Sequence, residues 1–284
     1  MEVASRSGVG FISKDITFVD WANKWLEVYK KPDVSENTYK STYYYPIINH
    51  IIPYFKNSKL QNIYPIDIKN FYSPKQYLSK STLSKIRNCL NSLFETAIDN
   101  NLCTRNPAKG IKFTSNKTKN KKKVYTDIEI IKVEKIAETT MPEIVILLET
   151  GLRRGELLGL KWSDIDFLNK TISVNRSVAY AKNGKTTINP PKKDSYRINP
   201  LSNKAIKVLK SIKKHPNSEY IFPLENGNPQ NPDTWGNKIR KFMNNLPKEI
   251  PRLTAHELRH TYGTYLHRNG VAIYTIQKIM GIKI

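Results

Sequence analysis

The sequence predicts a mainly α-helical protein with a small antiparallel β-sheet, divided between two domains. Apolar residues recur at helical spacing through most of residues 17–101. Two stretches within residues 171–180 alternate between apolar and polar side chains, as short strands do. Between these regions, residues 112–123 are rich in lysine and contain no acidic residue. The expected divisions are an N-terminal helical domain at 1–110, a basic linker at 111–123 and a second domain at 124–284.

The N-terminal domain contains three amphipathic segments. Thr17 and Asp20 have the spacing of a capping box, which starts the first segment. The second starts at Ser35 and includes Pro46, where we expect a kink, and the third runs through residues 81–97. The recurring apolar positions are Phe18, Trp21, Ala22, Trp25 and Tyr29, then Tyr39, Tyr43, Ile47, Ile51 and Ile52, then Leu83, Ile86, Leu90, Leu93, Phe94 and Ala97. We expect the aromatic side chains among them to form a core rather than to stack on nucleic-acid bases.

The second domain combines helices with short strands. Thr126 marks a helix start, and strands are expected at 171–174 and 177–180, followed by a turn at 182–185. Residues 196–201 can add a third strand. Further helices are expected around 144–148 and at 202–214, 233–245, 255–268 and 273–280.

The charge balance indicates a polyanionic partner. The chain has 47 Lys and Arg residues against 24 Asp and Glu residues, a formal charge of +23, which repels itself unless a polyanion shares the surface. We expect double-stranded DNA rather than a membrane, because basic residues are spread along the chain and no apolar run reaches membrane-spanning length. The N-terminal residues lack a signal-peptide layout. Cys89 and Cys103 form no Cys-x-x-Cys pair, so we expect reduced, buried thiols in a cytoplasmic protein.

The lysine-rich segment at 112–123 has two interpretations. It is either a solvated tether between the domains or a strap, a segment that lies along DNA phosphates and releases counterions on binding. The charge of +23 favours the strap. Its candidate DNA-binding residues are Lys117, Lys119, Lys121, Lys122 and Lys123.

The first candidate site segment is residues 150–166. Arg153 and Glu156 lie three positions apart, so they are expected to share a helix face. A surface ion pair of this kind contributes little to stability. Gly151, however, precedes the arginine and indicates a sharp turn that aims its side chain into a cleft.

Two more segments carry groups suited to binding an anion. Residues 189–198 contain Lys192 and Lys193, which are either ordinary turn lysines or groups that reach a phosphate or a base edge. His256 and Arg259 lie three positions apart on a predicted helix, so both can face one anion.

Together these segments resemble the tyrosine recombinases, the phage integrase family. Residues 150–160 match the family's Thr-Gly-Leu-Arg-x-x-Glu-Leu-x-x-Leu box, and residues 256–261 match its His-x-Leu-Arg-His-Thr box. The lysine segment falls between the two boxes, as it does in the family. The resemblance implies a helical, SAM-like core-binding domain, followed by an α+β catalytic domain that acts in DNA integration and recombination through a 3′-phosphotyrosine intermediate.

The resemblance also implies a role for each candidate residue in the two boxes. Arg153 and Arg259 would grip non-bridging oxygens of the scissile phosphate with their guanidinium forks. Glu156 would orient Arg153, and His260 would support the site from beside it. His256 would donate a hydrogen bond or transfer a proton.

The lysine segment would supply the general acid. Lys192 would protonate the leaving 5′-oxygen, with Lys193 as its rival for that role. The chemistry implied by the family needs no metal and no cofactor. Its partner is a DNA site, bound by a homo-oligomer that forms a tetramer on paired sites.

The sequence departs from the family pattern near its end. Residues 277–281 match the family, but Ile282 stands where His or Trp is expected. The family's nucleophilic Tyr follows roughly nine residues later, and here Tyr262, Tyr265 and Tyr274 lie too early, on helices needed for packing. We therefore expect the 284-residue polypeptide to bind DNA without forming a covalent phosphotyrosine link, and to lack the family's segment that docks on a neighbouring subunit.

Residues 256–260 also match the His-Glu-x-x-His motif of zinc proteases. The match extends to Gly263, but His267 comes one position late for the longer motif, which is a rotation of about 100° on a helix. A catalytic zinc needs three protein ligands, and no Asp or Glu follows Glu257 to complete such a set. The sequence favours the recombinase over the protease, and it leaves open a DNA-binding protein without catalysis.

Overall fold

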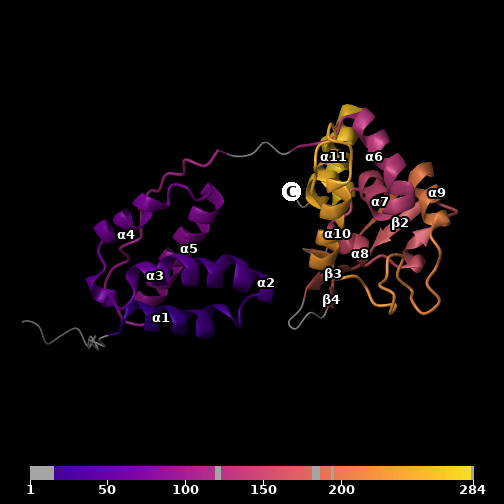
Figure 1. Ribbon diagram of the computed structural model, residues 1–284. Helices are drawn as coiled ribbons and strands as arrows, with labels where there is room; N and C mark the ends of the chain where they lie inside the picture. Colours follow the sequence, from indigo (N-terminus) through magenta and orange to yellow (C-terminus); the bar gives the residue numbers. More distant parts are fainter. Residues whose placement is uncertain (1–15, 119–122, 181–185, 193–194, 283–284) are drawn as a thin grey trace, which may run out of the picture. The chain divides into compact units, whose positions relative to one another are not determined.

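The computed structural model describes residues 16–118, 123–180, 186–192 and 195–282. The chain divides into a first compact unit up to residue 120 and a second from residue 121, each with its own buried core (Figure 1). The described residues are mainly helical, with two small antiparallel sheets in the second unit. The predicted fold class is confirmed. No helix among the described residues is long and apolar enough to cross a membrane.

The described part of the first unit contains helices and no named strand. Its α-helices are α1 (Phe18–Trp25), α2 (Glu36–Thr38), α3 (Ile52–Phe55), α4 (Pro65–Tyr72) and α5 (Lys80–Asp99), with π-helical turns at Leu26–Lys30, Tyr39–Tyr44 and Ile47–Ile51. The Thr17 hydroxyl caps α1 by accepting a hydrogen bond from the backbone N–H of Asp20 at 3.2 Å. The predicted helix start at Thr17 is therefore confirmed, and the Asp20 carboxylate accepts from the Thr17 hydroxyl at 2.5 Å.

Aromatic side chains of α1 pack against α5, as expected of a core. The indole Nε1 of Trp21 donates to the carbonyl of Leu93 at 3.1 Å, and Nε1 of Trp25 donates to the Thr96 hydroxyl at 3.1 Å. Since both indoles are buried, these bonds satisfy N–H groups that would otherwise be costly to bury.

The first part of the predicted linker packs on the first unit. Ile111 and Phe113 pack against its core, and the Ser115 hydroxyl donates to the carbonyl of Leu78 at 2.7 Å. Lys117 and Lys123 are exposed. The other strap candidates, Lys119, Lys121 and Lys122, lie outside the described residues, and the domain boundaries at 110 and 124 stay predictions.

The second unit carries the strands. Its helices are α6 (Asp127–Thr140), α7 (Pro142–Thr150), α8 (Arg154–Leu158), α9 (Asn203–Ser211), α10 (Pro232–Asn244), α11 (Ala255–Arg268) and α12 (Ile273–Met280). Its strands are β1 (Ile165–Asp166), β2 (Thr171–Val174), β3 (Ser177–Tyr180), β4 (Thr186–Asn189) and β5 (Arg197–Pro200). The strands predicted at 171–174, 177–180 and 196–201 are β2, β3 and β5.

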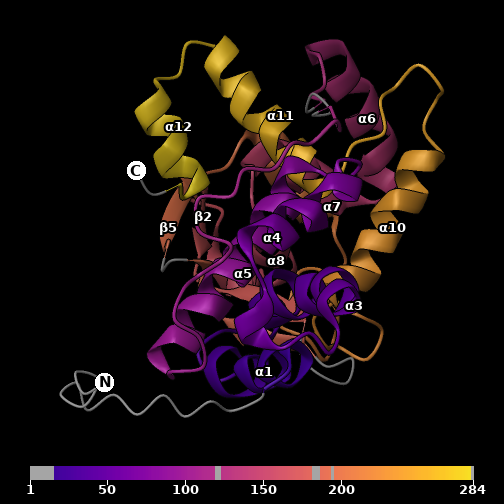
Figure 2. The ribbon, with the colours of Figure 1, turned by 90° about the vertical axis from the view of Figure 1, so that its left-hand side faces the viewer.

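The strands form two sheets rather than one. β2 pairs with β1 and β5, whereas β3 pairs with β4 in a separate hairpin. The turn predicted at 182–185 lies outside the described residues. Strand β5 lies at the edge of its sheet and contacts α12. The sheet therefore places β5, which follows the candidate lysines in the sequence, beside that helix (Figure 2).

Helix α7 lies at the centre of the second core. Its apolar residues are buried and contact α6, α9 and α11. Helix α11 in turn contacts α12. This packing places the end of α7, the start of α8 and one side of α11 around the same space.

A buried carboxylate lies away from that space, where α6, α7 and α9 meet. Glu134 of α6 is buried, and the Lys204 ammonium of α9 contacts its Oε2 while lying 4.0 Å from Oε1 of Glu149. Burial raises the pKa of Glu134 from its ordinary 4.5 to about 7, because Lys204 offsets the lost hydration only in part. The folded protein therefore holds this proton at a pH where the unfolded chain releases it.

We expect the free energy of unfolding to fall as pH rises from about 4.5 to 7, since the native state then binds a proton that the unfolded state has lost. In Glu134→Gln this decline should be smaller by about 3 kcal/mol, the equivalent of the pKa shift from 4.5 to about 7. Urea unfolding measured between pH 4 and pH 8 checks this. An equal decline in both proteins would contradict the assignment.

Candidate active site

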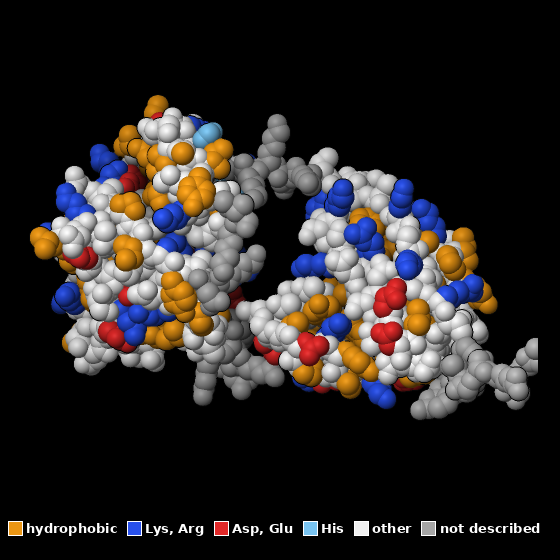
Figure 3. Space-filling model, turned by 180° about the vertical axis from the view of Figure 1, so that it is seen from behind, with side chains coloured by type: hydrophobic (Ala, Val, Ile, Leu, Met, Phe, Trp, Pro, Cys, Tyr) orange, Lys and Arg blue, Asp and Glu red, His pale blue; other side chains and the backbone are white. Residues whose placement is uncertain are grey.

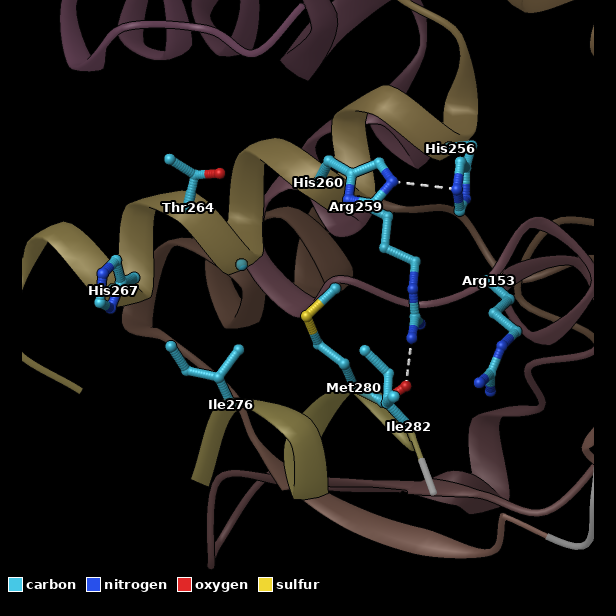
Figure 4. Close-up of a pocket in the computed structure, with 10 residues that line it drawn as sticks. Arg153, His256, Arg259, His260, Thr264, His267, Ile276, Met280 and Ile282 are labelled. Atoms are coloured by element: carbon cyan, nitrogen blue, oxygen red, sulfur yellow. Dashed lines mark hydrogen bonds between the residues drawn. The ribbon is translucent and has the colours of Figure 1, made fainter. Parts of the chain in front are cut away.

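Residues of both sequence boxes line one open pocket of about 420 Å³. Arg153 reaches it from the start of α8, while His256, Arg259 and His260 reach it from α11 (Figure 4). The remaining lining residues are Gly263, Thr264, His267, Ile276, Met280 and Ile282. The fold thus brings together candidate residues from two separate segments, 150–166 and 253–264, whereas the candidate lysines do not line this pocket among the described residues.

A left-handed turn aims Arg153 into the pocket. Helix α7 is capped by Gly151, whose φ is +61°, and a Cβ atom there would lie 2.3 Å from Cδ1 of Tyr262. The predicted sharp turn is present. Arg153 itself is the extended N-cap residue before α8, so the expectation that it shares a helix face with Glu156 is wrong. The two residues meet because the carboxylate folds back over the helix start.

We expect Gly151→Ala to destabilise the protein by about 2–5 kcal/mol, through left-handed backbone strain and overlap with the Tyr262 ring. Gly270→Ala is a matched control, because Gly270 has a φ of +80° but a Cβ atom added there would meet nothing within 4 Å. Gly270→Ala should lower the free energy of unfolding by about 1–2 kcal/mol, which is the part due to backbone strain alone. Equal losses in urea unfolding would show that the contact with Tyr262 does not matter.

Glu156 is a buried carboxylate held by arginines. Its side chain is fully buried, and its oxygens accept from Arg153 N at 2.8 Å and Arg153 Nη1 at 2.7 Å. Arg197 donates to both oxygens, from Nη2 at 2.7 Å and from Nη1 at 3.2 Å. Burial alone would raise the pKa of Glu156, but Arg197 and Arg153 more than offset it, and the pKa lies below its ordinary value. Glu156 is therefore ionised at neutral pH.

Three successive carbonyls at the end of α12 each accept from a different arginine. Ile279 O accepts from Arg197 Nε at 2.7 Å, Met280 O accepts from Arg259 Nη2, and Gly281 O accepts from Arg153 Nη2 at 2.6 Å. The last carbonyls of a helix have no intrahelical partner and carry partial negative charge. We call these three groups the carbonyl row.

Arg259 is buried but stays charged. Its Nη1 donates to the carbonyl of Gly151 at 2.6 Å, which ties α11 to the turn before Arg153. Burial, and then the positive charge of Arg153, lower the pKa of Arg259 to about 10. This value is still far above neutral pH, so the pocket holds two arginine cations.

The two box histidines lie against each other. Nε2 of His256 and Nε2 of His260 are 3.0 Å apart, so one ring donates a hydrogen bond to the other (Figure 4). His256 is exposed at the pocket. This contact is compatible with His260 as a support for His256, a role that stays a prediction.

The structure describes only one of the two candidate lysines. Lys192 is exposed between β4 and β5, and Lys193 lies outside the described residues. The choice between them stays open. Arg197 of the same segment, in contrast, lies at the site, although it was not among the predicted site residues.

The zinc-protease alternative requires a set of metal ligands. Among the described residues, no group of three or more His, Cys, Asp or Glu side chains is placed to hold a metal ion. The Glu257 carboxylate instead accepts from the backbone N–H of Thr254 at 2.8 Å and caps α11.

The tyrosines named as rival nucleophiles lie on the last two described helices. Tyr262 is buried against Gly151, and burial raises its pKa to about 12. Tyr265 and Tyr274 are exposed and are not among the residues that line the pocket.

Comparison with known proteins identifies the family. The model of the phage integrase family matches residues 117–283, and that of the phage integrase N-terminal SAM-like domain matches residues 17–76. The chain belongs to the phage integrase family. It is thus a tyrosine-type site-specific recombinase or integrase by descent.

Two relatives in this family align with nearly all of the chain. A tyrosine recombinase XerC-like protein of Caldanaerobacter subterraneus subsp. tengcongensis is 28% identical, over 97% of this chain and 78% of the relative. The ICEBs1 integrase of Bacillus subtilis is 27% identical, over 95% of this chain and 76% of the relative.

Solved structures of phage integrase relatives share the fold. The Tn1549 transposon integrase, in complex with transposon right end DNA, matches with a TM-score of 0.79 at 22% identity, over 95% of this chain and 92% of that chain. A lambda integrase dimer bound to a core site matches with a TM-score of 0.68 at 21% identity, over 95% and 96% of the two chains.

Proposed function

We propose that the second unit grips a scissile phosphate of double-stranded DNA between Arg153 and Arg259 during recombination. The observation that carries this proposal is that both guanidinium groups reach one open pocket from distant segments of the chain. A phosphorane-like transition state has more negative charge than the phosphate diester, so preorganised cations stabilise the transition state most.

Both arginines keep donors for such a phosphate. A guanidinium group has five N–H donors in one plane. Glu156 and the carbonyl row take some donors of Arg153, and Gly151 O and the row take some of Arg259. These contacts hold each fork in place before the phosphate binds, and the remaining N–H groups can reach its non-bridging oxygens.

The other candidate residues take supporting parts in this proposal. Lys192 or Lys193 protonates the leaving 5′-oxygen, and His256 donates a hydrogen bond or transfers a proton at the pocket. Glu156 orients Arg153, and His260 orients His256. Their support is the family match together with the contacts of Glu156 and the two histidines.

The relatives support a proposal for the DNA partner and for the assembly. The Tn1549 and lambda integrases of matching fold were solved with DNA, and lambda integrase as a tetramer on a Holliday junction. We extend DNA binding and assembly on paired sites to this chain. The charge of +23 supports the first extension, and Figure 3 shows Lys and Arg side chains on the surfaces of both units.

We expect the Kd for duplex DNA to rise about 10³- to 10⁵-fold between 50 and 200 mM salt, as for a protein that neutralises roughly six to ten phosphates. Replacement of the five strap lysines, Lys117, Lys119, Lys121, Lys122 and Lys123, by Gln should make the log–log slope shallower by up to about 4.5. Replacement of the same residues by Arg keeps the charge and is the control. A slope that is unchanged in the Gln variant would show that the strap does not lie along phosphates.

A further inference from the structure

We propose that Arg197 of β5 is a positioning residue for recombination, which fixes the guanidinium groups of Arg153 and Arg259 without touching DNA. The inference rests on the proposed phosphate grip of those two arginines. Arg197 is 6% exposed and is not among the residues that line the pocket. It belongs to neither sequence box, and it acts through two groups that both pocket arginines also contact.

The first of these groups is the Glu156 carboxylate. Arg197 covers it with two N–H groups, one on each oxygen, while the guanidinium of Arg153 donates only to Oε1, through Nη1. A carboxylate prefers two parallel bonds from one arginine fork. Without Arg197, Oε2 of Glu156 would keep a hydrogen bond only from the backbone N–H of Arg153, and it could then also accept from the Arg153 fork. Arg197 thereby leaves the other side of Arg153 directed toward the pocket.

The second group is the carbonyl row. Arg197 Nε donates to Ile279 O, and Asn199, two residues along the same strand face, donates to the same oxygen from Nδ2 at 2.9 Å. The end of α12 sits closely on the Arg197 fork, because a Cβ on Gly281 would lie 2.8 Å from its Nη1. The next two carbonyls hold Arg259 and Arg153. Arg197 therefore sets the position of the row, and the row holds one side of each of the two forks.

A matched arginine is available outside the site. The Nη1 of Arg176 donates to Gly159 O at 3.2 Å and pairs with the buried carboxylate of Asp164, and Arg176 does not line the pocket. It reproduces the chemistry of Arg197 as a partly buried ion pair with a backbone contact. Its substitution reports what the loss of such a pair does to the fold alone.

The test uses the full 284-residue chain labelled with ¹⁵N-arginine. The guanidinium NMR signals of Arg153 and Arg259 are assigned with the variants Arg153→Lys and Arg259→Lys. A fork held by fixed partners gives separate Nη signals, and a free fork gives averaged ones. The same samples are titrated with inorganic phosphate, and the midpoint of urea unfolding is measured for each variant. The variants are Arg197→Gln, Arg197→Lys, Arg176→Gln and Arg176→Lys.

We expect both Arg197 variants to average the Nη signals of Arg153 and Arg259, and to weaken phosphate binding about tenfold, since a lysine keeps the charge but not the fork. The Arg176 variants should lower the unfolding midpoint similarly and leave those signals unchanged. The proposal would be overturned if Arg197→Lys kept the wild-type Nη signals of Arg153 and Arg259, or if Arg176→Lys changed those signals equally. A wild-type chain with fixed signals that does not bind phosphate would overturn the phosphate grip instead, while the signals still decide the role of Arg197.

Discussion

Arg153→Lys and Arg259→Lys should each reduce DNA strand cleavage by about a hundredfold to a thousandfold, the usual loss when one preorganised donor to a developing oxyanion is removed. Lysine keeps the positive charge and so preserves general DNA affinity, but a single ammonium cannot replace the planar fork that meets two phosphate oxygens. The effect should therefore appear in chemistry and not in binding. For Arg259 the loss should be at least as large, because its fork also ties α11 to Gly151 and to the carbonyl row.

Cleavage is measured as covalent capture of a nicked suicide duplex. The chain used is a fusion in which residues 282–284 are replaced by a tail of the family, with His first and Tyr roughly nine residues later. Arg176→Lys in the same fusion is the control and should capture DNA normally, because that arginine lies outside the pocket. Capture at the control level by Arg153→Lys and Arg259→Lys would show that these arginines do not grip the scissile phosphate.

Glu156→Gln should destabilise the protein by about 3–5 kcal/mol, the cost of removing one partner from a buried ion pair. The carboxylate bonds Arg153 and Arg197, and Arg259 Nη1 lies 4.0 Å from its Oε2. An amide cannot balance these cations and replaces one acceptor oxygen with a donor. Since the pKa of Glu156 is lowered, its contribution is present above the ordinary pKa of 4.5 and is lost as pH falls through the native pKa.

The matched control for that variant is Glu134→Gln at pH 8. Glu134 is also buried beside a cation, but its raised pKa means that ionisation is already costly there. Its substitution should be neutral or stabilising at that pH, whereas Glu156→Gln should be destabilising. Equilibrium urea unfolding of both variants checks the pair. A loss of similar size at both positions would mean that burial, and not the arginine cluster, decides the energetics.

The elements that the sequence predicts well are those with local signals. Helices α11 and α12 begin and end at the predicted residues, because caps and helical spacing are properties of neighbouring residues. Strands β2 and β3 were also located, but their division between two sheets was not, since pairing depends on distant partners such as β5. The short strands β1 and β4 have no clear alternation and were missed.

Prediction of the site residues was limited in the same way, because contacts between residues far apart in the sequence leave no local signal. The two boxes place Arg153 and Arg259 in one pocket, as expected from the resemblance. Arg197 was missed because its partners lie 41 and 82 positions away along the chain, at Glu156 and Ile279. The available signal was an arginine and Asn199 at alternate positions of a short strand, which puts both side chains on one face, and both are buried.

The most direct test of the phosphate grip is an experimental structure of the chain bound to a duplex that carries its recombination site. We predict one phosphate in the pocket, with Arg153 and Arg259 each donating to a non-bridging oxygen at about 2.7–2.9 Å. Glu156, Arg197 and the carbonyl row should keep the contacts described above. A complex in which the DNA backbone passes elsewhere, with neither guanidinium within hydrogen-bond distance of a phosphate, would contradict the proposed grip.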